Sequence, residues 1–212
     1  MHQILVYADS LSWGIVPDTR RRFDFDRRWP GVLELELKNC GIPARVIEDC
    51  LNGRRTVWDD PYKPGRNGLD GLPQRIEINS PLSLVVVLLG TNDFQSMHQH
   101  NAWQSAQGVG AIIRAIRGAP IEPGMPVPTI LVVAPPPIQK AKGKIVPKFE
   151  SAEVKATGLA QEIRAVAQEN SCHFFDAGSV TSTSRVDGVH LDEDQHAILG
   201  RALAGVIKPL LP

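Results

Sequence analysis

The amino-acid sequence predicts an α/β fold in which one parallel β-sheet is covered by helices on both faces. Short apolar, β-prone runs alternate along the chain with longer amphipathic segments, in the order βαβαβαβαβα. Each apolar run also ends in a polar, turn-rich loop, as strands do where they reach the carboxyl edge of such a sheet. The chain contains no internal repeat, so we expect one domain that spans residues 1–212.

The first strand is expected over residues 3–7, which are mostly apolar and β-prone. It stops abruptly at the small polar residues around Ser10. Residues 17–28 mix arginines with aspartates, which is typical of a solvent-exposed loop. A helix is predicted from residue 29 or 30 to residue 39, because its apolar side chains recur at helical spacing and Gly41 permits the left-handed conformation that ends a helix.

A second strand is predicted over residues 44–51, and it ends in Asn52-Gly53. Residues 54–73 are rich in Asp, Pro, Gly and Asn and are long for a simple connection, so they are either disordered or a functional loop. A helix is expected over residues 72–79. The clearest strand spans residues 84–89, where every residue is apolar, as in a central strand covered on both faces.

Residues 102–117 predict an amphipathic helix, because their branched apolar residues lie on one side. The fourth strand, at residues 129–134, stops at three consecutive prolines. The remaining elements are a Lys-rich loop, a helix, a short strand and a final helix capped by Asp192, over residues 139–148, 150–170, 173–175 and 192–210.

The composition excludes some classes of function. The 23 Lys and Arg residues balance the 23 Asp and Glu residues, so the net charge supports binding of neither nucleic acid nor an anionic membrane. The three cysteines are far apart and odd in number, which argues against a disulfide framework and favours buried thiols in a reducing compartment. The first residues lack the basic segment of a signal peptide and no apolar run is long enough to span a membrane, so a cytoplasmic location is expected.

Neither a metal nor another cofactor is expected. The pair His98 and His100 has no third ligand placed beside it, so a solvated loop is the preferred interpretation. The sequence also contains neither the Gly-rich dinucleotide pattern nor a Lys-containing phosphate loop, which argues against a nucleotide site.

Polar groups follow three of the predicted strands and precede the last helix. They are Ser10, Asn52-Gly53, Gly90-Thr91-Asn92-Asp93 and Asp187-Gly188-Val189-His190. Because the carboxyl ends of parallel strands meet at one edge of a sheet, these four groups can converge on one cleft.

The residue types in this cleft predict a nucleophilic serine. A serine hydroxyl needs a base to take its proton, and His190 can be that base, with Asp187 holding its ring in the correct tautomer. The oxyanion of an attacked ester would be stabilised by the backbone N–H groups of Ser10 and Gly53 and the side-chain amide of Asn92. Structural alternatives stay open at this point: Ser10 and Gly53 also suit plain turns, and Asn92 suits a helix cap.

These four blocks, in this order, resemble the SGNH (GDSL-like) hydrolase family from near the first residue to the last helix. The longer strings resemble its bacterial arylesterase/acyltransferase branch, namely Asp9-Ser10-Leu11-Ser12-Trp13-Gly14, Val133-Ala134-Pro135-Pro136-Pro137, Asp176-Ala177-Gly178-Ser179-Val180 and Asp187-Gly188-Val189-His190. The resemblance implies a flavodoxin-like three-layer sandwich with a five-stranded parallel sheet, and a serine esterase without a metal. It implies Ser10, His190 and Asp187 as the catalytic triad and Ser10, Gly53 and Asn92 as the oxyanion site. It further implies a homo-oligomer, a tetramer or an octamer, whose loops narrow the mouth of the active site.

One residue departs from the family pattern. The first block of the family usually begins with Gly, and this chain has Ala8. If the position needs a positive φ, Ala8 strains the turn by roughly 1 kcal/mol or more. If φ is ordinary, the change adds one methyl group close to the nucleophile.

The function expected from these residues is hydrolysis of small aryl or short-chain acyl esters through an acyl-enzyme, which an alcohol or a peroxide could also resolve by acyl transfer. Trp13, Phe94 and residues 135–149 are expected to line the substrate pocket. Two alternatives keep the triad and change the substrate, to an acetylated carbohydrate or to a thioester. A non-enzymatic alternative is a flavodoxin-like binding module.

Overall fold

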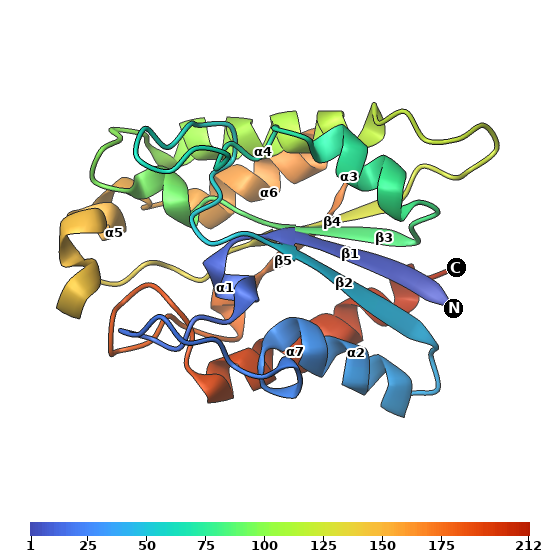
Figure 1. Cartoon of the computed structure of the whole chain (residues 1–212), viewed down its shortest axis with the longest axis horizontal. Helices are drawn as coiled ribbons and strands as arrows, with labels where there is room; N and C mark the ends of the chain where they lie inside the picture. Colours follow the sequence, from blue (N-terminus) through green and yellow to red (C-terminus); the bar gives the residue numbers. More distant parts are fainter.

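A computed structural model describes the whole chain, from Met1 to Pro212. Its centre is one five-stranded sheet with the strand order β2-β1-β3-β4-β5, in which all neighbouring strands are parallel (Figure 1). The strands are β1 (His2–Ala8), β2 (Ala44–Cys50), β3 (Leu84–Leu88), β4 (Thr129–Ala134) and β5 (His173–Asp176). The predicted parallel α/β sheet is therefore confirmed.

Helices cover both faces of this sheet and complete a flavodoxin-like three-layer sandwich (Figure 1). One layer contains α2 (Trp29–Asn39) and α7 (Glu193–Ile207). The other contains α3 (Leu72–Asn79), α4 (Ala102–Arg117) and α6 (Leu159–Glu169). The short elements are α1 (Ser10–Trp13), α5 (Ala152–Lys155) and the 3₁₀ helices η1 (Phe25–Arg27), η2 (Thr91–Phe94), η3 (Gly143–Lys148), η4 (Ala177–Ser179) and η5 (Lys208–Leu210).

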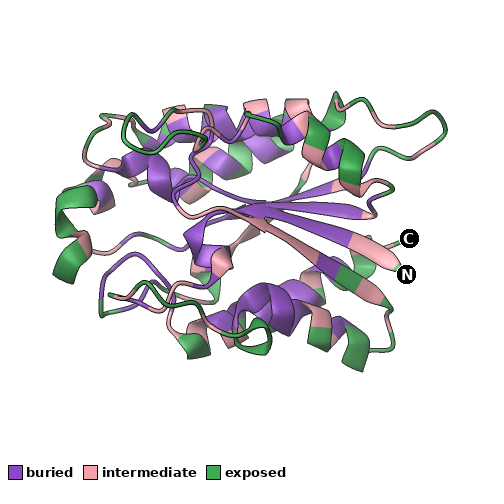
Figure 2. Ribbon diagram, viewed as in Figure 1, coloured by how far each residue is buried: buried purple, intermediate pink, exposed green.

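The sheet is apolar on both faces, which explains why its central strands read as continuous apolar runs. In β3, Val85 and Val87 join the cluster of buried residues under α4 and α6, whereas Val86 joins the cluster under α2 and α7. Figure 2 shows the central strands and the inner faces of the helices as buried. None of the helices combines the length and the apolar composition that a membrane crossing requires.

The helix expected over residues 150–170 is two helices. Gly158 adopts φ +85°, a left-handed conformation that ends one helical segment and precedes α6. A glycine inside a helical pattern does not by itself predict such a break, because helices tolerate the residue at a cost of about 1 kcal/mol.

Buried arginines anchor two loops, of which the sequence left one open between disorder and function and predicted the other to be solvent-exposed. In the segment 54–73, Arg54 and Arg55 are buried, and Arg54 donates hydrogen bonds to the carbonyl oxygen of Ala8 and to Asp49. At the end of the segment expected to be solvent-exposed, Arg28 is buried and forms an ion pair with Glu48. These buried guanidinium groups anchor long loops to the carboxyl edge and flank of the sheet.

The cysteine prediction was only partly right. All three thiols are free, but Cys40 is exposed, and Cys50 and Cys172 are only partly buried. Cys40 lies directly after α2, and its neighbours Lys38 and Asn39, in the last turn of that helix, also face solvent.

Candidate active site

Ser10 lies where β1 passes into the short helix α1, at the carboxyl edge of the sheet. Asp9 caps this helix by accepting a hydrogen bond from the Leu11 N–H over 2.9 Å, and Gly14 ends it with φ +84°. Ser10 is therefore in the first helical turn, where backbone N–H groups lack acceptors within the helix. The residue is only 6% exposed, so the hydroxyl and the neighbouring N–H face a confined space.

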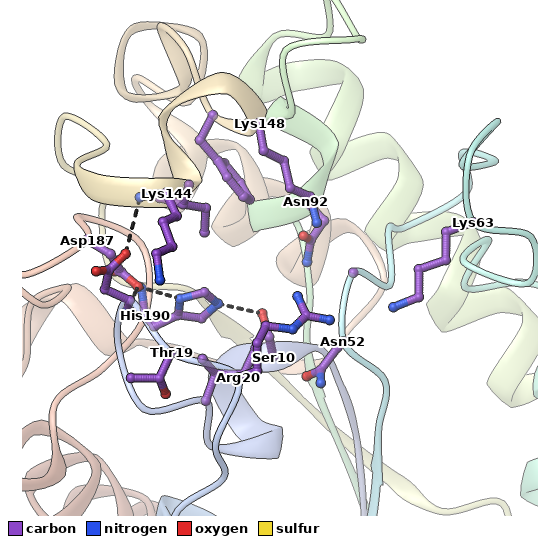
Figure 3. Close-up of a pocket in the computed structure, with 15 residues that line it drawn as sticks. Ser10, Thr19, Arg20, Asn52, Lys63, Asn92, Lys144, Lys148, Asp187 and His190 are labelled. Atoms are coloured by element: carbon purple, nitrogen blue, oxygen red, sulfur yellow. Dashed lines mark hydrogen bonds and ion pairs between the residues drawn. The ribbon is translucent and has the colours of Figure 1, made fainter.

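The three residues of the expected triad are in hydrogen-bond contact (Figure 3). Nε2 of His190 lies 3.2 Å from Oγ of Ser10, and Nδ1 lies 2.7 Å from Oδ2 of Asp187. Asp187 also accepts the backbone N–H groups of Val189 and His190, each over 2.9 Å, on its other oxygen. The loop is thus folded back on Asp187, and the carboxylate holds the backbone and the ring of the same histidine.

A left-handed glycine permits this turn. Gly188 adopts φ +80°, and a Cβ atom there would lie 2.5 Å from the carbonyl oxygen of Lys140. Any larger residue would therefore displace the loop that positions Asp187 and His190.

Asp187 is ionised at neutral pH. Burial by itself raises the pKa of this carboxyl, but the hydrogen bond and charge of His190, together with the two backbone N–H groups, hold the pKa at about 2. A carboxylate on Nδ1 leaves Nε2 free to accept the proton of Ser10.

Asn92 has a defined orientation beside Ser10. Its Nδ2 donates to Oδ2 of Asp9 over 2.9 Å, and its Oδ1 accepts from Nε2 of Gln95 over 2.7 Å. An amide nitrogen has two donors, so one N–H of Asn92 is left for a ligand. Asn92 lines the same cavity as Ser10 and His190.

Gly53 follows β2 and reaches the same cavity. It adopts φ +85°, which explains the glycine, while the nearest atoms to a hypothetical Cβ lie 3.9 Å away on Arg66. The side chain of Arg66 donates from Nε to the carbonyl oxygen of Asn52 over 3.0 Å and so holds this turn. The structure brings together all five residues expected at the triad and the oxyanion site.

The cavity has a volume of about 480 Å³, and most of the residues that line it are polar or charged. Its lining consists of Ser10, Ile15, Asp18, Thr19, Arg20, Asn52, Gly53, Lys63, Asn92, Lys144, Ile145, Lys148, Phe149, Asp187 and His190. The expected contribution of residues 135–149 is present at its C-terminal end, in Lys144, Ile145, Lys148 and Phe149.

Trp13 and Phe94 were expected in the pocket wall and do not line the cavity. The Trp13 ring is covered instead by Arg22, whose guanidinium carbon lies 4.8 Å from the ring centroid. Phe94 is fully buried in the core beneath α4, because η2 turns its side chain away from the edge where Asn92 lies.

Two cationic cavity residues, Arg20 and Lys63, were not expected in the pocket, whereas Lys144 and Lys148 belong to the segment 135–149 that was. Arg20, Lys144 and Lys148 are solvent-exposed, as expected for the arginine run and the Lys-rich loop, and they also line the cavity. Lys63 comes from the long loop after β2. Clustered basic residues in the sequence were a signal, but their convergence depends on how three loops fold.

Two aspartates beside the site are structural. Burial raises the pKa of both Asp9 and Asp93 to about 6, although hydrogen bonds oppose the shift. Asp93 accepts hydrogen bonds from the N–H and the hydroxyl of Thr56 and from the hydroxyl of Ser105. Asp93 therefore joins the loop after β2 to α4.

The histidine pair is not solvated as expected. The ring of His100 stacks on Trp58 with centroids 3.9 Å apart, and His98 stacks on His100 at 4.8 Å. Burial and the neighbouring positive charge of Arg55 lower the pKa of His98 to about 4. The pair packs the loop after β2 against the segment that follows η2.

The comparisons with known proteins identify the fold and the family of the chain. The chain matches the model of the GDSL-like lipase/acylhydrolase family over residues 9–198. The solved structures of the aryl esterase of M. smegmatis, native and inhibitor-bound, are 38% identical, with a TM-score of 0.93 and both chains fully covered. The carbohydrate acetylesterase Est24 of Sinorhizobium meliloti is 31% identical, with a TM-score of 0.92 and both chains fully covered.

A lipase/acylhydrolase of Enterococcus faecalis, 16% identical with a TM-score of 0.70 over the whole chain and 98% of its own, shares the fold. The comparison with curated protein sequences gives no match. The family model spans both the segment of Ser10 and the loop of His190, and the chain belongs to the GDSL-like lipase/acylhydrolase family.

Proposed function

We propose that this carboxylic ester hydrolase cleaves small aryl or short-chain acyl esters through an acyl-enzyme formed on Ser10. The observation that supports this mechanism is the continuous contact from Ser10 Oγ to His190 Nε2, at 3.2 Å, and from His190 Nδ1 to Asp187, at 2.7 Å. No other serine of the chain has a hydrogen bond to a histidine that also contacts a carboxylate.

The proposed reaction has two steps, acylation and deacylation of Ser10. Oγ of Ser10 attacks the ester carbonyl carbon while Nε2 of His190 takes the hydroxyl proton, and the C–O bond to the alcohol then breaks as His190 gives the proton to the departing oxygen. In the second step water attacks the acyl carbon while Nε2 of His190 takes a proton from it. The bond from this carbon to Oγ of Ser10 then breaks as His190 returns the proton to Oγ, and the acid is released. An alcohol or a peroxide in place of water gives acyl transfer.

The oxyanion formed in both steps is stabilised by the N–H groups of Ser10 and Gly53 and by the free N–H of Asn92. These donors belong to three different strand ends, and the hydrogen bonds to Asp9 and Gln95 orient Asn92 before substrate arrives. A preorganised donor of this kind contributes about 3–4 kcal/mol to the stabilisation of the transition state.

Two substrate classes are candidates. The similarity to the aryl esterase of M. smegmatis favours aryl esters, and the cavity of about 480 Å³ has room for a small substrate. The similarity to Est24, together with only three apolar residues in the cavity lining, favours an acetylated carbohydrate as the second candidate. Comparing kcat/KM on an aryl acetate, acetylated xylose and an acyl thioester separates these candidates and a thioesterase.

The mechanism is tested by Ser10→Ala with Ser12→Ala as the matched control. Ser12 is buried, accepts a hydrogen bond from Trp29 Nε1 and does not line the cavity. Ser10→Ala should remove release of p-nitrophenol from its acetate and covalent labelling by a fluorophosphonate, whereas Ser12→Ala should keep both. Turnover that survives in Ser10→Ala contradicts the proposed nucleophile.

We also propose that the protein is a homo-oligomer. Tyr62, Trp103 and Val154 are large apolar side chains exposed on the surface of the single chain, and the net charge of zero gives little protection against association. Light scattering at micromolar concentration should give a mass of several subunits, and a monomeric mass would contradict this proposal.

A further inference from the structure

We propose that the active site selects esters that carry a negatively charged group, a substrate class that rests on the proposed esterase function. Four cationic side chains line the cavity that contains Ser10, namely Arg20, Lys63, Lys144 and Lys148. They come from the loop after α1, the loop after β2, and η3. Because the whole chain has no net charge, this concentration of positive charge is local to the cavity.

None of these cations has a carboxylate partner. All ion pairs of the structure are formed by other arginines or by His190. The two acidic residues of the cavity lining are already engaged. Asp187 holds His190, and Asp18 accepts a hydrogen bond from the Lys144 backbone N–H over 3.2 Å while its own N–H donates to Asp187. A substrate anion would therefore meet four cations that form no ion pair within the chain.

Three of the cations act on one another. Partial desolvation is the main cause that lowers the pKa of Lys148, although the residue is solvent-exposed, and the positive charges of Arg55, Lys63 and Arg20 lower it further. The pKa of Lys63 is also lowered, mainly by partial desolvation and further by the positive charges of Arg66 and Arg20. Asp60 acts in the opposite direction on both lysines, but its carboxylate pairs with Arg55. A bound anion would relieve the repulsion between these positive charges.

The arrangement allows an anion on either part of the ester to reach a cation. In Figure 3, Lys63 and Lys144 lie on opposite sides of Ser10, with Lys144 on the side of His190. Lys144 is joined through Asp18 to Asp187, on the side of the base, whereas Lys63 belongs to the loop that Arg66 attaches to Asn52. Both the acyl and the alcohol parts pass through a cavity with cations on its wall.

Two pairs of chromogenic or aryl esters test the inference. The first pair is mono-p-nitrophenyl adipate and p-nitrophenyl hexanoate, which have acyl chains of equal length with and without a terminal carboxylate. The second pair is 4-acetoxybenzoate and its methyl ester, which differ in the charge of the leaving group. In at least one pair, kcat/KM should be about tenfold higher for the anionic ester at low ionic strength, and added salt should reduce the preference because exposed charges are screened over about 10 Å at 0.1 M.

Substitution assigns the preference to the cavity. Lys63→Gln and Lys148→Gln should each reduce the ratio of anionic to neutral kcat/KM by about threefold to tenfold. Lys38→Gln is the control, because Lys38 is exposed in the last turn of α2, just before β2 begins at the opposite edge of the sheet. Equal kcat/KM within both pairs, or a ratio that both variants leave unchanged, overturns the inference. The neutral esters report the proposed function separately, since a failure of that function removes their turnover as well.

Discussion

Gln95 donates from Nε2 to Oδ1 of Asn92 over 2.7 Å, and this contact determines which way the Asn92 amide faces. The Oε1 atom of Gln95 accepts from a guanidinium nitrogen of Arg55 over 2.6 Å, and a guanidinium can only donate. Gln95 must therefore present its amide nitrogen to Asn92, and Asn92 must present its own amide nitrogen to Asp9. The orientation of the oxyanion donor is set by a buried arginine on another loop.

Gln95→Glu should lower kcat about tenfold or more on p-nitrophenyl acetate with a smaller effect on KM. The substituted carboxylate can only accept, so Asn92 must turn its nitrogen toward residue 95 and lose its orientation toward Asp9 and the substrate oxygen. Gln104→Glu is the matched control, because Gln104 is half-buried outside the cavity and caps α4 through its side-chain oxygen, which a carboxylate can replace. An unchanged kcat in Gln95→Glu would show that Arg55 and Gln95 do not position the oxyanion donor.

Asp187→Asn should reduce kcat by about three to four orders of magnitude, because an amide that donates to Nδ1 leaves the proton on the wrong nitrogen of His190. The side-chain oxygen of the substituted asparagine can still accept the backbone N–H groups of Val189 and His190, so the loop should keep its fold. Asp176→Asn, which alters the cap of η4 and no residue of the cavity lining, is the control and should keep kcat within a factor of two to three. Activity close to that of the unsubstituted enzyme in Asp187→Asn would exclude the carboxylate from the mechanism.

The polar residues at strand ends were predictable because two constraints act on the same positions. A buried strand must be apolar, so the first small polar residues after it mark the sheet edge, as Ser10 does after β1. Parallel topology then brings several edges together, which placed Asn92 and Gly53 near Ser10 without any knowledge of distances.

The wall of the cavity was not predictable in this way. Phe94 is two residues after Asn92 and points into the core, because a 3₁₀ turn rotates successive side chains to different sides. Lys63 and Lys148 reach the cavity through loops whose paths depend on distant anchors, among them the ion pair of Arg55 with Asp60. Periodicity carries no information on such contacts.

Ala8→Gly should destabilise the protein by about 1–2 kcal/mol, because the glycine loses a buried methyl group and adds backbone freedom in the unfolded chain. Ala8 is a fully buried strand residue without a positive φ, and its methyl group packs in the cluster under α2 and α7. The Ala at this position is therefore not strained, and the first of the two alternatives raised by the family pattern is wrong. Urea unfolding measures the change, and a more stable Ala8→Gly variant would show that strain is present.

The buried carboxyl of Asp93 should make stability fall as pH rises. Burial raises its pKa to about 6 in the folded protein, above the ordinary value of 3.8, so the folded state holds a proton that the unfolded state has released between about pH 4 and pH 6. The contribution of this group is therefore fully present below about pH 4, is lost as pH rises through 6, and amounts to at most about 3 kcal/mol.

Asp93→Asn isolates this contribution, because the hydroxyls of Thr56 and Ser105 that donate to Asp93 can accept from an amide instead. Two other carboxyls also make the free energy of unfolding depend on pH. The pKa of Asp9 is raised to about 6, and the pKa of Asp187 is lowered to about 2, which matters only below about pH 4. The variant keeps both residues, so their contributions cancel when the two proteins are compared. In urea unfolding at intervals from pH 4.5 to 7.5, the stability of the unsubstituted protein relative to Asp93→Asn should decrease with pH. A difference that is constant with pH, or that increases, would mean that Asp93 is ionised throughout and is stabilised by its three hydrogen bonds rather than penalised by burial.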